Sequence, residues 1–254
     1  MQIQIKNLSL VYPLRSLDHY LLRAKIVSSV KNLFRKTKSS EDFSKKKNHI
    51  VALDNINFNL ESNDRVGLIG LNGSGKSTLL STLAGIYAPS SGEVDIDYNF
   101  SIPIIQPYSV CEHDDTVHNN IIVIGLLLGF KKKQIEKQMN EILKFAELED
   151  YQNLPVATLS QGMKFKMVFA VCFILDGKKI YFIDEFFTTG DEKFQNTGFD
   201  YINQKKECII MVCSHSRRII ENFCNKVLIL DKGKQIFFGN IDEGFEIYNK
   251  IIKK

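Results

Sequence analysis

Apolar and polar residues alternate in two segments near the start of the chain, residues 2–12 and 51–60. Alternation with a period of two predicts strands that bury one face. Between them, residues 14–49 carry apolar residues at helical spacing and end in a stretch rich in Lys and Ser. This insertion is either a solvated surface excursion or a basic amphipathic helix that lies against a membrane surface or a membrane partner.

Short apolar runs alternate with helical patterns along the rest of the chain. Strands are predicted over residues 65–69, 92–97, 100–105, 180–183, 208–213, 226–231 and 235–238. Helices are predicted to begin near residue 78 and to cover residues 116–145 (with a break near 125–130), 161–175, 191–204, 217–224 and 241–252. This order predicts an α/β fold with a largely parallel sheet, and the helical stretch 116–175 predicts an inserted subdomain.

A glycine-rich loop follows the strand predicted at residues 65–69 and precedes a helix. It reads Gly70, Leu71, Asn72, Gly73, Ser74, Gly75, Lys76, Ser77, Thr78 and fits the phosphate-loop pattern. Such a loop surrounds a phosphate with backbone N–H groups, while the helix N-terminus attracts the same anion. Lys76 is expected to reach the β- and γ-phosphates and Ser77 to bind Mg²⁺. A chance glycine turn is excluded because spacing, flanks and order all agree.

Two acidic residues, Asp184 and Glu185, end the apolar strand predicted at residues 180–183. On a parallel sheet this strand end lies beside the phosphate loop. We expect Asp184 to hold Mg²⁺, through water, and Glu185 to polarise the attacking water as a general base. The alternative, a solvated strand terminus, is common for a lone Asp-Glu pair but does not explain its place after a phosphate loop.

A second candidate anion contact opens the helix predicted at residues 161–175. Ser160 is a good N-cap, and an ordinary capped helix would need nothing more. Capping does not require Gly162, which costs stability inside a helix. A helix start built from Ser160, Gln161 and Gly162 suits a phosphate.

Composition narrows the class of protein. The length of 254 residues suits one large α/β domain or one domain with a subdomain, and the 44% hydrophobic content can supply a full core. A net charge of +4 gives no basis for a nucleic-acid partner. The five cysteines form no C-x-x-C pair or metal spacing, as expected for reduced core residues. No signal peptide is recognisable, and the longest apolar run, residues 121–130, is too short to cross a bilayer.

Together these motifs make the chain resemble the ATP-binding cassette ATPases over nearly its whole length. The run from Leu159 to Met163 resembles the family's signature motif, and His215 matches the switch histidine that contacts the γ-phosphate. Asp191 falls in the D-loop region. Tyr12 looks like the aromatic residue that stacks on adenine, although a core or surface tyrosine is a competing interpretation.

The resemblance implies a single cassette domain over residues 1–254, with a P-loop NTPase core, a mainly parallel sheet, an antiparallel β subdomain and a helical subdomain at about residues 112–175. It implies that two cassettes enclose two ATP molecules with Mg²⁺. Ser160, Gln161 and Gly162 of one subunit would complete the phosphate site of the other, in a homodimer or a heterodimer.

Several details resemble the ATPase subunits of bacterial polysaccharide exporters, which handle O-antigen, capsule or teichoic acid. They are Gly162-Met163 in the signature, Gly190-Asp191 followed by Phe194, the segment from Ala84 to Tyr87 with Pro89, Ser91-Gly92, and the segment from Phe145 to Leu148. This implies a subunit on the cytoplasmic face of the inner plasma membrane that works with a membrane permease, with peripheral membrane contact through residues 14–49. The alternatives are another transporter branch and a non-transport regulatory ATPase.

The chain also departs from the family pattern. The expected Mg²⁺-contacting glutamine of the Q-loop is either replaced by Glu112 or supplied by Gln106. Gln161 stands where the signature usually has Ser or Gly. Exporters of this kind often carry a C-terminal carbohydrate-binding domain, which we expect to be absent because the sequence ends at Lys254.

Overall fold

The described residues of the computed structural model are 1–13, 49–104, 111–175, 177, 179–184, 192–205, 207–214 and 216–252. They form one nine-stranded sheet with the order β4-β1-β2-β9-β8-β3-β7-β6-β5. The strands are β1 (Gln2–Pro13), β2 (His49–Glu61), β3 (Arg65–Ile69), β4 (Ser91–Asp95), β5 (Ser101–Ile104), β6 (Ile180–Asp184), β7 (Ile209–Cys213), β8 (Lys226–Asp231) and β9 (Lys234–Gly239). The helices are α2 (Lys76–Leu83), α3 (Val117–Leu127), α4 (Lys132–Ala146), α5 (Gln161–Ile174), α6 (Glu192–Gln204), α7 (Arg217–Phe223) and α8 (Ile241–Ile252).

The sheet has a parallel centre and an antiparallel flank. Strands β8, β3, β7, β6 and β5 run parallel, with β3 between β7 and β8. Strand β1 pairs antiparallel with both β2 and β4, and β8 pairs antiparallel with β9. Every residue of β7 is buried, as is typical of a parallel strand covered on both faces, whereas β2 alternates between buried and exposed positions. The parallel sheet predicted from the sequence pattern and the antiparallel part implied by the family resemblance are therefore both present.

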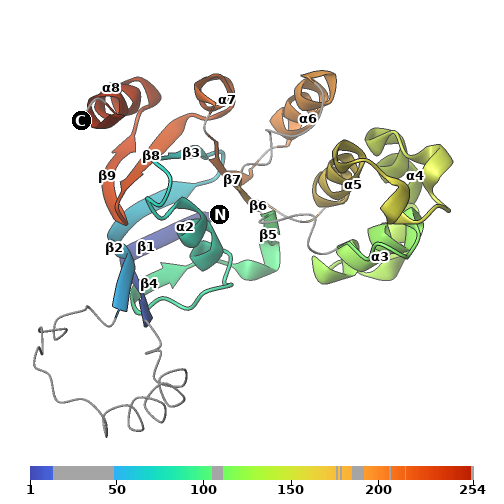
Figure 1. The fold of residues 1–254 in the computed structure, drawn as a ribbon, viewed down its shortest axis with the longest axis horizontal. Helices are drawn as coiled ribbons and strands as arrows, with labels where there is room; N and C mark the ends of the chain where they lie inside the picture. Colours follow the sequence, from blue (N-terminus) through green and yellow to red (C-terminus); the bar gives the residue numbers. More distant parts are fainter. Residues whose placement is uncertain are drawn as a thin grey trace, which may run out of the picture.

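Alternate residues of the central strands face two separate cores. In β6, Ile180 and Phe182 pack into the core that contains the leucines of α2, whereas Tyr181 and Ile183 pack into the core that contains α5. Helix α2 thus covers one face of the sheet, and in Figure 1 α6, α7 and α8 lie on the opposite side. The ends of the parallel strands are held between two packed layers.

Helices α3, α4 and α5 stand together beside the β5 edge of the sheet (Figure 1). The predicted break in the helical stretch is present, because α3 ends at Leu127 and α4 begins at Lys132, with Gly129 between them at φ +84°. Helix α5 is buried continuously from Lys164 to Ile174. Its Phe173 stacks on Tyr181 of β6, with 4.7 Å between the ring centroids, and this contact fastens the helical group to the sheet.

One predicted segment lies mostly outside the described residues, and two predicted strands have slightly different ends in the structure. Residues 14–48, which make up nearly all of the predicted insertion, lie outside the described residues. Strand β4 ends at Asp95, and β7 begins at Ile209, one residue later than predicted. Among the described residues, none of the helices has the length and apolar character needed to cross a bilayer.

Candidate functional site

The phosphate loop joins the buried strand β3 to helix α2, as predicted. Gly75 is the N-cap of α2 and has φ +103°, a conformation that a residue with a Cβ rarely adopts. A Cβ at Gly75 would also lie 2.9 Å from the carbonyl oxygen of Ala52. Gly75 offers no side chain to cap the first turn of α2, so the N–H groups there are available to an anion.

Lys76 is held at the mouth of this loop. Its ammonium donates to the carbonyl oxygens of Gly70 at 2.9 Å and Leu71 at 3.1 Å, and the residue is only 7% exposed. An ammonium has three N–H donors, so these two bonds leave one for a phosphate oxygen. Ser77 is exposed at the start of α2, and Ser74 Oγ is buried without a hydrogen-bond partner among the described residues.

Asp184 reaches the same edge of the sheet through the register of three strands. It pairs with Cys213 of β7, and Cys213 pairs with Leu68 of β3, two residues before the phosphate loop. Two strand spacings of about 4.8 Å therefore separate the backbone of Asp184 from that of β3. The half-buried carboxylate of Asp184 and the hydroxyl of Ser77 are hard oxygen donors.

These two donors fit Mg²⁺, which keeps several waters and phosphate oxygens and takes few ligands from the protein. The described part of the chain has no group of three or more His, Cys, Asp or Glu side chains that could hold a metal by itself. Four further predicted residues, Gln106, Glu185, Asp191 and His215, lie outside the described residues, and their roles stay predictions.

A pocket of about 570 Å³ opens over the phosphate loop. Its lining joins the predicted Tyr12 to loop residues that include Asn72, Gly73, Lys76, Ser77 and Thr78. Five residues that the sequence did not point to complete the lining: Ile50, Val51, Ala52, Lys232 and Gly233. The last two form the β8–β9 turn. Strand topology could have pointed to them, because a turn after a parallel strand lies at the ligand-binding edge of the sheet.

The predicted signature residues begin α5, away from this pocket. Ser160 is the N-cap and accepts a hydrogen bond from the backbone N–H of Met163 at 3.2 Å. Ser160 and Gln161 are exposed, and a Cβ at Gly162 would meet no atom closer than 3.9 Å. Among the described residues of one subunit nothing requires a glycine at residue 162, so the space above it is available to another molecule.

Glu112 does not join the nucleotide pocket in this structure. Its side chain is exposed and is not among the residues that line the pocket. Its backbone N–H donates to Asn120 Oδ1 at 2.8 Å, and its carbonyl oxygen accepts from Asn120 Nδ2 at 3.0 Å, so the segment is fastened to α3. The proposed contact between Glu112 and Mg²⁺ stays a prediction.

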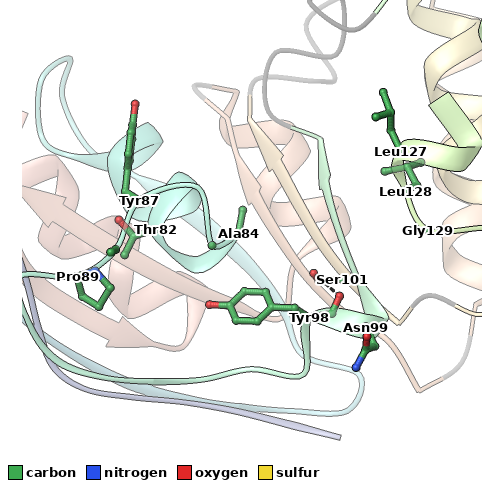
Figure 2. A pocket seen from close by; sticks show the side chains of 12 residues that line it. Thr82, Ala84, Tyr87, Pro89, Tyr98, Asn99, Ser101, Leu127, Leu128 and Gly129 are labelled. Carbon is green, nitrogen blue, oxygen red and sulfur yellow. Dashed lines mark hydrogen bonds between the residues drawn. The ribbon is translucent and has the colours of Figure 1, made fainter. Parts of the chain in front are cut away.

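A second, larger pocket of about 910 Å³ lies between the loop after α2 and the end of α3. Figure 2 shows the side chain of Tyr98 pointing toward Thr82 and Pro89, with Leu127 at the end of α3 and the following Leu128 on the far side. Large apolar side chains around it are exposed, and Leu127 reaches 67%. No sequence pattern predicts this pocket, because its walls are far apart along the chain.

Comparison with known proteins places the chain among ATP-binding subunits. Residues 53–188 match the family model described as "ABC transporter". The chain is 40% identical over 188 residues to the O-antigen export system ATP-binding protein RfbE of Yersinia enterocolitica, covering 72% of this chain and 77% of that protein. It is 35% identical over 237 residues to the teichoic acids export ATP-binding protein TagH of Bacillus anthracis, covering 92% of this chain but only 41% of that longer protein.

A solved structure agrees with the fold. It is the dimeric, post-hydrolysis state of an ATP-binding cassette bound to ADP and phosphate, which superposes with a TM-score of 0.69 at 20% identity and covers 94% of this chain and 98% of that one.

Proposed function

The chain belongs to the ABC transporter family, and on this premise we propose that it is the ATP-hydrolysing subunit of a transporter that exports a lipid-linked polysaccharide through a separate membrane permease. The observation that carries the ATPase proposal is the meeting of the phosphate loop, Ser77 and Asp184 at one edge of the sheet, beside a pocket bordered by Tyr12.

Each site residue has a separate role in the transfer of the γ-phosphoryl group to water. The phosphate loop and Lys76 bind the β- and γ-phosphates, and Tyr12 lies against the base. Mg²⁺, when bound by Ser77 and Asp184, supplies positive charge to the phosphate oxygens. Glu185 accepts a proton from the attacking water, and His215 contacts the γ-phosphate. Each group acts on charge that develops during the reaction, where electrostatic stabilisation contributes most.

A homodimer would complete this site. The exposed Ser160, together with the open space over Gly162, supports an approach by the phosphates bound to a second subunit. The residues that line the nucleotide pocket of one subunit do not include the signature, as a site completed by a partner requires. The related cassette of known structure is itself a dimer.

The second pocket supports a permease partner. Three large apolar side chains of its lining are exposed, an arrangement that favours a docking site for a protein segment. They are Tyr87, Tyr98 and Leu127. With the permease docked there, the subunit lies peripherally on the cytoplasmic face of the inner plasma membrane, and residues 14–49 are its proposed additional contact with the membrane.

The similar proteins are named for the export of teichoic acids and O-antigen, and these names support a polysaccharide as the substrate class. The whole exporter's substrate and partners rest on this similarity, since the chain spans under half the length of the Bacillus anthracis protein. A cassette of another transporter branch, or a regulatory cassette without transport, would share the nucleotide pocket but not a dependence of surface polysaccharide on this gene.

Two experiments test the proposal. In purified protein, Lys76→Ala should abolish ATP binding, and Glu185→Gln should leave ATP bound in a stable dimer with hydrolysis nearly lost. Full turnover by the Glu185→Gln variant would remove the general-base assignment. In the source cell, replacing the gene by the Glu185→Gln form should stop polysaccharide from reaching the surface while the lipid-linked precursor accumulates. Normal surface polysaccharide in that strain would contradict export.

A further inference from the structure

The nucleotide pocket contains two lysines, and only Lys76 belongs to a predicted motif. The other, Lys232, lies in the turn between β8 and β9 and lines the pocket together with Tyr12 and the phosphate loop. Lys76 is buried and anchored by two carbonyl oxygens. Lys232 is exposed and makes no hydrogen bond or ion pair with any described residue. Its ammonium is therefore available to an anion in the pocket.

The backbone at Lys232 is unusual for a lysine. Asp231 pairs with Lys234 across the hairpin, so Lys232 and Gly233 form a two-residue turn. Their φ values are +48° and +80°, as in a type I′ turn. Asn or Gly is favoured at the first of these positions because a residue with a longer side chain is strained there. A lysine held in this conformation at a ligand-binding edge points to a role for its charge.

The turn is fixed to the phosphate loop itself. The backbone N–H of Gly233 donates to the carbonyl oxygen of Ser74 at 2.9 Å, and the carbonyl oxygen of Gly233 accepts from the N–H of Asp54 at 2.8 Å. A Cβ at Gly233 would lie 2.6 Å from the carbonyl oxygen of Ala52. Lys232 is thus attached to a turn that packs tightly against both the loop and β2, and its Cα is held in place before any ligand arrives.

We propose that Lys232 is a second cationic contact for the nucleotide, donating to its phosphate oxygens from the β8–β9 turn. The inference rests on the proposed function, since it requires that a nucleotide occupies the pocket. An ammonium binds phosphate as a point charge, so the contact should strengthen with the number of phosphate charges and weaken with salt. The gain in affinity that Lys232 provides should then be largest for ATP, smaller for ADP, smaller still for AMP, and zero for adenosine.

The substitution Lys232→Asn tests this without disturbing the turn. Asn-Gly is the favoured pair for a type I′ turn, so the thermal midpoint of the variant should be unchanged or higher. Its affinity for ATP should fall on the order of fivefold at low salt, as expected for a partly exposed charge contact. Its affinity for adenosine should not change, and the salt dependence of ATP binding should become shallower. Lys232→Arg should retain most of the affinity.

The neighbouring Lys234 provides the matched control. It lies on the same hairpin, forms an exposed ion pair with Asp54 at 3.5 Å and does not line the pocket. Lys234→Gln removes the same charge and should leave ATP affinity at the wild-type value. Equal loss in the Lys232 and Lys234 variants would overturn the contact in favour of a general field effect. Wild-type affinity and salt dependence in Lys232→Asn would overturn it outright, whereas unchanged affinity in Lys76→Ala would instead remove the proposed function.

Discussion

The ring of Tyr12 meets the ring of Tyr87 edge to face, with 5.9 Å between the centroids and 87° between the planes. Tyr12 lines the nucleotide pocket and Tyr87 lines the second pocket, so this pair stands between them. The backbones beside the pair are also joined. Ser90 N–H donates to the carbonyl oxygen of Ser9 at 2.8 Å, and Val11 N–H donates to Ser90 Oγ at 2.9 Å.

Because Tyr87 supports the ring of Tyr12, Tyr87→Ala should weaken nucleotide binding without touching the nucleotide. The edge-to-face contact is worth about 0.5–1.5 kcal/mol, so a loss of up to about tenfold in ATP affinity is expected. Titration of a fluorescent ATP analogue measures it. Tyr12→Ala sets the maximum loss, and the double variant should lose no more than Tyr12→Ala alone. Additive losses would mean that Tyr87 acts independently of Tyr12.

The two central glycines of the phosphate loop should respond differently to alanine. Both have positive φ, +77° at Gly73 and +103° at Gly75, so each substitution carries a backbone cost of about 1 kcal/mol. A Cβ at Gly73 meets nothing within 4 Å, whereas one at Gly75 lies 2.9 Å from the carbonyl oxygen of Ala52. Gly75→Ala should therefore lower the free energy of unfolding by clearly more than Gly73→Ala. Chemical denaturation compares them, and equal losses would contradict the role of this close approach.

At Gly162 in the signature motif, an alanine substitution should affect dimerisation but not the stability of the isolated subunit. Gly162→Ala adds a Cβ to open space in a helix, so the isolated subunit should be as stable as the wild type or gain up to about 1 kcal/mol. In the Glu185→Gln background the same change should weaken ATP-dependent dimerisation, because the added methyl group stands where the partner's phosphates approach. Light scattering with and without ATP measures the effect.

A different glycine provides the contrast for that experiment. A Cβ at Gly198 of α6 would lie 2.9 Å from Phe169 Cζ, so Gly198→Ala should destabilise the subunit by about 1–3 kcal/mol through overcrowding. If Gly162→Ala instead unfolds the subunit, or dimerises normally, the partner-facing role of this surface is wrong.

Buried thiols predict how stability changes at high pH. Burial raises the pKa of Cys224 from 9.0 to about 12 and raises the pKa of Cys172 as well. Above pH 9 the unfolded chain releases these protons while the folded chain keeps them, so the free energy of unfolding falls as pH rises from about 9 toward 12. Cys224→Ala should remove about 1 kcal/mol of the loss between pH 8 and pH 10. Denaturation of both proteins at the two pH values measures it, and identical slopes would contradict burial of the ionising thiol.

The sequence predicted the parts of the site that are local along the chain. The phosphate loop, the capped start of α5 at Ser160 and the acidic end of β6 are each contiguous segments, and their residue types demand a specific local structure. The parallel sheet then followed from the alternation of strands and helices, because parallel strands bring their carboxyl ends to one edge.

Relationships between distant segments could not be predicted in this way. The turn that carries Lys232 meets the phosphate loop because β3 pairs with β8, and Tyr87 meets Tyr12 because the loop after α2 is hydrogen-bonded to β1. Neither pairing leaves a periodic pattern in the sequence. Glu112 is exposed near the start of α3, and the choice between Glu112 and Gln106 as the Mg²⁺ contact stays a prediction. Glu185 and His215 lie outside the described residues. The role of Glu185 rests on its place after the strand that ends at Asp184, and the role of His215 rests on the family resemblance.

Helix α5 has one end fixed and one end exposed. Phe173 near its C-terminus stacks on Tyr181 with only 13° between the ring planes, while Ser160 caps the other end in solvent. The helix has fourteen residues, a length of about 21 Å at 1.5 Å per residue. Because α5 is buried from Lys164 to Ile174 against its neighbouring helices, it would move with them as one body rather than alone. A rotation of that body by about 5° about the Phe173–Tyr181 contact would carry Ser160 about 2 Å over this length, enough to make or break a hydrogen bond to a phosphate on the proposed partner subunit.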